Sequence, residues 1–244
     1  MANDRTPTAS PRLHYIYDPL CGWCYAAAPL IHAAAGIAGL AVELHAGGLL
    51  AGAQRRAITP QWRDYVLPHD RRIAELTGQP FGAAYVDGLL RDVGYVLDSE
   101  PPISAVLAAG VLAGDANRAG LVMLERLQRA HYVEGRRIAD PAVLAELAAE
   151  LGHAAAIGEV YRQMSGAITQ AHIAASRRLL QQVGGQGFPT LALSVAGELS
   201  QRLDVGPYLG QPEAWRAQLI AWLGSALPND AGTAPFCAPD GGEC

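Results

Sequence analysis

The sequence contains no lysine, so all 18 residues in its Lys+Arg count are arginine. This absence excludes Schiff-base chemistry on a lysine and phosphate binding by a P-loop lysine. The sequence also has no Gly-x-Ser-x-Gly motif and no His-Glu-x-x-His motif. These absences exclude a serine hydrolase with a nucleophile elbow and a zincin-type metalloprotease.

Charged residues are scarce as well, at 17% of the 244 residues, whereas hydrophobic residues make up 50%. A chain of this size and composition can bury a sizeable core. Its net charge of −5 offers no basic surface for nucleic acid. Residues 1–12 lack the apolar core of a signal peptide, and no later apolar run is long enough to span a bilayer. We therefore expect a cytoplasmic protein that binds neither nucleic acid nor membrane.

Two of the four cysteines, Cys21 and Cys24, lie between a strand-like alternating run and an Ala-rich, helix-like run. In a reducing compartment, such a close pair is more often catalytic or metal-binding than structural. Unpaired N–H groups and the helix dipole at a helix start favour the thiolate form of Cys21. Cys24 would lie on the same helix face, where it can attack a mixed disulfide formed at Cys21. The spacing thus predicts a two-electron redox pair.

Other readings of the cysteines stay open. The pair could be inert and buried, or it could hold Zn²⁺ together with Cys237 and Cys244, although the spacing of those two cysteines argues against a metal site. Cys237 and Cys244 are most simply exposed thiols near the C-terminus. They could also form a local disulfide, an accessory redox pair that exchanges with Cys21 and Cys24. We predict no metal site.

The flanking residues carry a resemblance to a known family. Asp-Pro-Leu-Cys-Gly-Trp-Cys-Tyr at 18–25, followed by Pro29, resembles the redox motif of the DsbA family of thioredoxin-fold proteins, in particular its FrnE-like members. A second segment, Gly-Gly-Gln-Gly-Phe-Pro-Thr-Leu-Ala-Leu at 184–193, resembles the one in which these proteins carry a cis-proline facing the dithiol. The resemblance implies an α/β thioredoxin fold with a large all-helical insertion.

The resemblance also assigns roles to residues. Cys21 and Cys24 would be catalytic, and Pro189 would be the cis-proline. The neighbouring backbone groups of Phe188 and Thr190 would be presented to an extended substrate segment. Trp23, between the cysteines, would offer partner chains an apolar contact surface.

Two further side chains have alternative roles that the sequence leaves open. Asp18 could accept the proton of Cys24 during resolution, or it could cap the turn before the helix, and capping is the more common role of an aspartate there. His45 could approach the redox site, although a structural histidine is the simpler interpretation.

Together, pattern and resemblance predict a thioredoxin-like domain at 12–58 and 167–225, an inserted helical domain at 59–166 and a flexible C-terminal tail at 226–244. The expected strands are 13–18, 41–46, 190–195 and 198–204. The expected helices are 22–36, 61–76, 82–93, 103–112, 121–132, 142–151, 169–183 and 212–223.

The predicted function is that of a thiol–disulfide oxidoreductase or isomerase. It would act without a cofactor, by mixed-disulfide exchange with protein disulfides, protein thiols or small thiols such as glutathione. One alternative is a glutathione-dependent isomerase or transferase, of the 2-hydroxychromene-2-carboxylate isomerase or kappa class. Those families carry Ser where Cys21 stands and lack the second cysteine. Another alternative is a non-enzymatic ligand-binding module.

Overall fold

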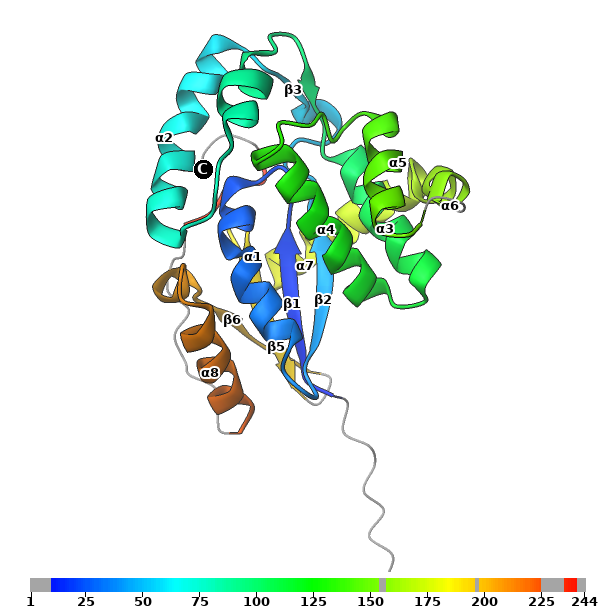
Figure 1. Ribbon diagram of the computed structural model, residues 1–244. Coiled ribbons are helices and arrows are strands. Elements are labelled where there is room, and N and C mark those ends of the chain that lie inside the picture. The colour runs from blue at the N-terminus through cyan, green and yellow to red at the C-terminus, as the bar shows by residue number, and fades with distance from the viewer. Residues whose placement is uncertain (1–9, 154–156, 196–197, 225–234, 241–244) are drawn as a thin grey trace, which may run out of the picture.

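The computed structural model describes four stretches of the chain, residues 10–153, 157–195, 198–224 and 235–240. They build a central sheet with helices on both of its faces (Figure 1). Among the described residues, no helix is both long enough and apolar enough to cross a bilayer.

The central sheet has four strands in the order β2-β1-β5-β6. β1 (Arg12–Tyr17) runs parallel to β2 (Ala41–Ala46) and antiparallel to β5 (Thr190–Val195). β6 (Glu198–Leu203) pairs antiparallel with β5. The three strands expected around Leu13, Ala41 and Thr190 are therefore present, and the expected hairpin at 190–204 is formed.

Alternation along β1 decides which face each helix covers. Leu13, Tyr15 and Tyr17 are buried on the face that carries α1 (Gly22–Ala35), and the Tyr15 hydroxyl donates to the Cys24 carbonyl at 3.1 Å. The unit β1-α1-β2 is a parallel crossover, which is right-handed in nearly all proteins and places the start of α1 at the carboxyl end of β1.

Two other helices complete the layers around the sheet. α8 (Pro212–Leu223) packs against α1, with Trp215 fully buried. α7 (Ala167–Gln182) covers the opposite face and contacts β2. Figure 1 shows α1 in front of the strands and α7 behind them.

The segment between β2 and α7 is mainly helical. Its α-helices are α2 (Pro60–Thr77), α3 (Glu100–Ala113), α4 (Ala116–Tyr132), α5 (Pro141–Glu150) and α6 (Ile157–Met164). Its shorter elements are the 3₁₀ turn η1 (Gly52–Gln54), the π-helical turn η2 (Ala84–Gly88), the 3₁₀ turn η3 (Leu89–Arg91) and the hairpin of β3 (Arg56–Ala57) with β4 (Val96–Leu97). A further 3₁₀ turn, η4 (Gly206–Tyr208), precedes α8.

Some details differ from expectation. The helix predicted over 82–93 is wrong, because this segment forms η2 and η3 instead. Its start packs against another element: a Cβ on Gly82 would lie 2.0 Å from the Val133 carbonyl oxygen. The segment is therefore shaped by a tertiary contact that periodicity does not show. α6 and the β3-β4 hairpin were also not among the predicted elements.

Candidate active site

Cys21 is the N-cap residue of α1, and Cys24 lies in its first turn. The Cys24 N–H points to the Cys21 sulfur, with N and Sγ 3.4 Å apart. Both residues are fully buried free thiols. The start of α1 therefore brings the two cysteines together, with the Cys24 N–H directed at the Cys21 sulfur.

The surroundings of the second thiol favour its protonated form. Burial raises the pKa of Cys24 well above its usual range, and the hydrogen bond to Cys21 and the charge of Cys21 raise it further. The N–H of Asp18, 3.4 Å from the Cys24 sulfur, acts in the opposite direction. A thiol whose pKa is raised reacts as a thiolate only after a base has removed its proton.

Asp18 lies beside this thiol and is completely buried. Its carboxylate accepts hydrogen bonds from Leu20 N at 2.8 Å, Leu49 N at 2.6 Å and the Ser99 hydroxyl at 2.9 Å. Burial raises the pKa of Asp18 to about 6, although these hydrogen bonds oppose the shift. The contact to Leu20 is the predicted turn cap, and the pKa lies where an aspartate can exchange protons near neutral pH.

The segment expected to face the dithiol does so. The Phe188–Pro189 peptide bond is cis. The Cys21 thiol donates to the Phe188 carbonyl oxygen at 3.3 Å, which joins positions 167 residues apart. Thr190 is buried at the start of β5, and its hydroxyl donates to Gly187 O at 2.7 Å. Residues from both motifs thus form one site.

Cys237 also reaches this site, which the sequence did not indicate. Its N–H donates to Phe188 O at 2.6 Å, and Phe188 N–H donates to Cys237 O at 2.8 Å, as in an antiparallel strand pair. Cys237 is 1% exposed and disulfide-bonded, so the expectation of an exposed thiol in a flexible tail is wrong for this residue. Pairing with Phe188 buries it. Cys244 lies outside the described residues.

Trp23 is 2% exposed and therefore offers no open contact surface in this structure. It lines a small pocket of about 40 Å³ together with residues of α2, η2 and α4 and with Cys237. Asp70 also lines the pocket, and burial raises its pKa to about 7. The volume suits a few water molecules but not a tripeptide. Any larger ligand would have to displace part of the wall.

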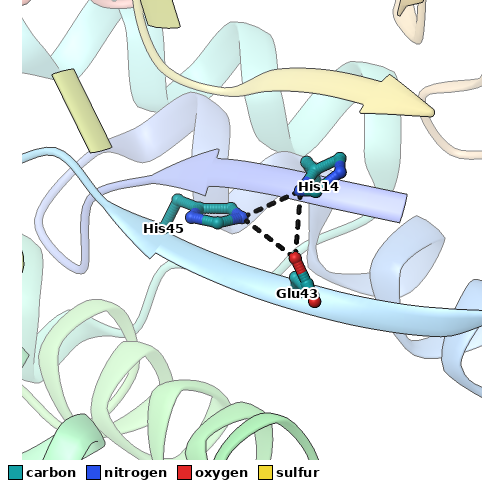
Figure 2. A group of neighbouring side chains, drawn as sticks. All are labelled: His14, Glu43 and His45. Carbon is teal, nitrogen blue, oxygen red and sulfur yellow. Dashed lines mark hydrogen bonds and ion pairs between the residues drawn. The ribbon is translucent and has the colours of Figure 1, made fainter. Parts of the chain in front are cut away.

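His45 points away from the thiols. It lies next to His14 and Glu43 (Figure 2) and close to His172 of α7. Burial lowers the pKa of His14, and burial together with His14 and His172 lowers the pKa of His45 to about 4. Of the two roles left open for His45, an approach to the redox site is therefore not found, and the histidine belongs to a separate polar cluster with His14 and Glu43.

Comparison with known proteins agrees with this geometry. The profile of the DSBA-like thioredoxin domain matches residues 12–204. The solved cytosolic disulfide reductase DsbM from Pseudomonas aeruginosa is 55% identical, with a TM-score of 0.80 over 87% of this chain and 98% of that chain. A DsbM structure with GSH is 51% identical, with a TM-score of 0.78 over 88% and 100% of the two chains.

A 2-hydroxychromene-2-carboxylate isomerase is 16% identical, with a TM-score of 0.54 over 89% of this chain and 100% of that chain, which shows a shared fold alone. No curated protein sequence matches. The predicted α/β thioredoxin fold with a helical insertion is confirmed. The chain belongs to the DSBA-like thioredoxin family, and it is an enzyme of that family's disulfide oxidoreductase class.

Proposed function

We propose that the protein is a cytoplasmic disulfide reductase that works through the Cys21–Cys24 dithiol. The observation that carries the proposal is the placement of Cys21 at the N-cap of α1, against Phe188 O, with Cys24 in the first turn of the same helix. The proposed direction of electron flow, from the dithiol to a substrate disulfide, and the proposed cytoplasmic location are supported by the similarity to DsbM, a cytosolic disulfide reductase. No cofactor takes part in the proposed chemistry.

The reaction proceeds in two exchanges. The Cys21 thiolate attacks one sulfur of the substrate disulfide, so that a Cys21–substrate bond forms and the other substrate sulfur leaves as a thiolate, which takes a proton from water. Cys24 then gives its proton to Asp18 and attacks Cys21 Sγ. The second substrate thiolate leaves, and two electrons have passed from the dithiol to the substrate.

Small thiols regenerate the enzyme. One thiol opens the Cys21–Cys24 disulfide by forming a mixed disulfide at Cys21, and a second thiol releases it as the oxidised dimer, which restores both cysteines. We assign this role to glutathione, because a DsbM structure with GSH is among the similar proteins. Two protein thiols would supply the same two electrons to the Cys21–Cys24 disulfide as two small thiols.

Substrate docking would use the backbone of Phe188 and the wall formed by Pro189 and Thr190. An extended peptide would take the two backbone hydrogen bonds that Phe188 now makes with Cys237. Trp23 would contact the substrate once Cys237 has left the pocket that both residues line. The helical segment 59–166 would act as an inserted domain that covers this side of the dithiol.

The backbone of Cys237 pairs with Phe188, which is where we propose that a substrate peptide docks. We include Cys237 and Cys244 in the proposal as an accessory redox pair. The Cys21 thiolate would attack the Cys237 sulfur and expel the sulfur bonded to it, and Cys24 would then release Cys237 as a thiol. The dithiol would be oxidised and the accessory disulfide reduced, with two electrons transferred.

Trapping the intermediate tests this function. Cys21→Ala is expected to lower glutathione-dependent reduction of a disulfide-bonded peptide by roughly 10³-fold or more, because the attacking sulfur is lost. Cys24→Ala is expected to accumulate a mixed disulfide on Cys21 that mass spectrometry detects. His32→Gln, an exposed substitution on α1, serves as the control. Full activity of Cys21→Ala would refute the proposal.

A further inference from the structure

A second cluster of chemistry-bearing side chains lies on the sheet, on the face away from α1. In the β1-β2 register, His14 is opposite Glu43. His45 follows Glu43 by two positions, so its side chain projects from the same face of β2. Figure 2 shows the three side chains converging between the two strands. This set of two imidazoles and a carboxylate is separate from the dithiol.

The three facing atoms are spaced like the ligands of one ion. His14 Nδ1 lies 3.0 Å from His45 Nε2 and 3.2 Å from Glu43 Oε2, and His45 Nε2 lies 3.8 Å from Glu43 Oε2. Nitrogen and oxygen ligands about 2.0–2.1 Å from a tetrahedral zinc ion are about 3.3–3.4 Å apart. The observed spacings bracket that value.

Hydrogen bonds among the three side chains do not account for both short contacts of His14 Nδ1. A neutral imidazole has one N–H and a carboxylate has none. A single proton on His14 Nδ1 would have to be divided between His45 Nε2 and Glu43 Oε2 to serve both short contacts. A cation at the centre would instead accept a lone pair from each of the three atoms.

Other groups orient the ligands from outside. The far nitrogen of the His14 ring, Nε2, is 3.0 Å from Ser194 Oγ on β5, and the far oxygen of Glu43, Oε1, is paired with Arg12. Such outer partners hold metal-binding side chains in orientation and tune their basicity. The side chains of His14, Glu43 and His45 are 12%, 21% and 21% exposed, so the cluster is open to ions in solution.

We propose that His14 Nδ1, Glu43 Oε2 and His45 Nε2 bind a divalent ion of the zinc class, with water completing the coordination. His172, the histidine of α7, is not part of the cluster, and its Nε2 accepts the Ala46 N–H at 3.0 Å. A bound ion would join β1 to β2 by side-chain ligands in addition to their backbone pairing. The strand that leads into the dithiol would thereby be held more firmly.

The test uses the full chain carrying Cys21→Ser and Cys24→Ser without added reductant, so that the dithiol is removed and Cys237 stays in its disulfide. Equilibrium dialysis against Zn²⁺ is expected to retain one equivalent of metal. His45→Gln or Glu43→Gln is expected to weaken binding at least tenfold, and Ser194→Ala roughly tenfold through the orientation of His14. Co²⁺ is expected to give a visible ligand-field band in the parent that His45→Gln removes.

His32→Gln is the matched control, because His32 pairs with Glu125 at 3.1 Å on the exposed surface without a third ligand in the described residues. Its affinity for Zn²⁺ should equal that of the parent. Glu43→Gln preserves the size of the side chain and an acceptor for Arg12, and an unchanged melting temperature without metal would show that the variant is folded. Retention of zinc by His45→Gln and Glu43→Gln, or no stoichiometric binding by the parent, would overturn the proposal without affecting the proposed reductase function.

Discussion

Cys237 and Cys21 share one acceptor, because the Cys237 N–H and the Cys21 thiol both point to the Phe188 carbonyl oxygen, at 2.6 Å and 3.3 Å. The backbone around Cys237 therefore lies where the proposed substrate peptide would dock, next to the Cys21 sulfur. Substrate and tail cannot both use the N–H and C=O groups of Phe188.

Competition between tail and substrate can be measured with two variants. Cys237→Pro removes the N–H that pairs with Phe188, whereas Cys237→Ser keeps it, and both remove the sulfur. We expect Cys237→Pro to reduce a disulfide peptide roughly fivefold faster than Cys237→Ser at low substrate concentration, since a hydrogen bond is worth about 0.5–1.5 kcal/mol. Steady-state kcat/KM values give the comparison. Equal values would show that the tail does not limit docking.

The resolving step should depend on the ionisation of Asp18. With its pKa raised to about 6, Asp18 is a proton acceptor above that pH and loses this ability below it. The rate at which Cys24 releases a mixed disulfide is expected to fall about tenfold per pH unit below about pH 6. Asp18→Asn should be slow and should lack this pH dependence. Rapid-mixing experiments on a preformed mixed disulfide measure the step, and an unchanged profile in Asp18→Asn would exclude the role.

Asp70 should lower the stability of the protein at alkaline pH. Burial raises its pKa to about 7, above the usual value of 3.8. The folded state thus binds the proton more tightly, so the contribution of Asp70 to stability is complete below about pH 4 and is lost as pH rises through about 7. Asp70→Asn, which retains an acceptor for the Tyr85 hydroxyl, should therefore match the parent at pH 4 and exceed it by a few kcal/mol at pH 8.

Denaturant unfolding at the two pH values measures this difference. Asp87→Asn provides the control, because the Asp87 side chain is 62% exposed and pairs with Arg91 at the surface. Its stability relative to the parent should show little pH dependence. A parent that gains stability between pH 4 and pH 8 relative to Asp70→Asn would contradict the argument.

Gly47 should tolerate no side chain. A Cβ at this position would lie 2.2 Å from the ring of Phe188, which is itself fully buried. Gly47→Ala is expected to destabilise the fold by about 1–3 kcal/mol and to weaken substrate docking through displacement of Phe188. Gly158→Ala in α6 meets none of the described residues within 4 Å of the added methyl and should be neutral or stabilising. Thermal unfolding of both variants distinguishes the two cases.

Much of the fold and the pair of cysteines could be predicted from the sequence, because these features depend on short stretches of chain. The range of β2 follows from alternation at 41–46, and the start of α2 follows from Thr59, whose hydroxyl accepts the Trp62 N–H. The two thiols and their flanking strand and helix share one short stretch of chain. By contrast, β3 and β4 have two residues each, which is too short for a periodic pattern.

What could not be predicted depends on contacts between distant segments. The docking of Cys237 on Phe188 joins two loops, and no spacing rule relates them. The seven histidines show no pairing pattern in the sequence, and only the register of β1 against β2 brings His14 opposite Glu43. Ser99 was missed as a partner of Asp18 for the same reason, since the two residues lie 81 positions apart.

The contacts of Asp18 have a mechanical consequence. Its carboxylate accepts hydrogen bonds from the N–H of Leu49, in the loop after β2, and from the hydroxyl of Ser99, just before α3. Ser99 also exchanges two hydrogen bonds with Leu50. A proton that arrives at Asp18 during turnover would occupy a lone pair that one of these donors now uses. Each catalytic cycle would then briefly weaken the hydrogen bonds that connect Asp18 to the loop after β2 and to the start of α3. Disulfide exchange at the cysteines would therefore be coupled to movement of these two segments.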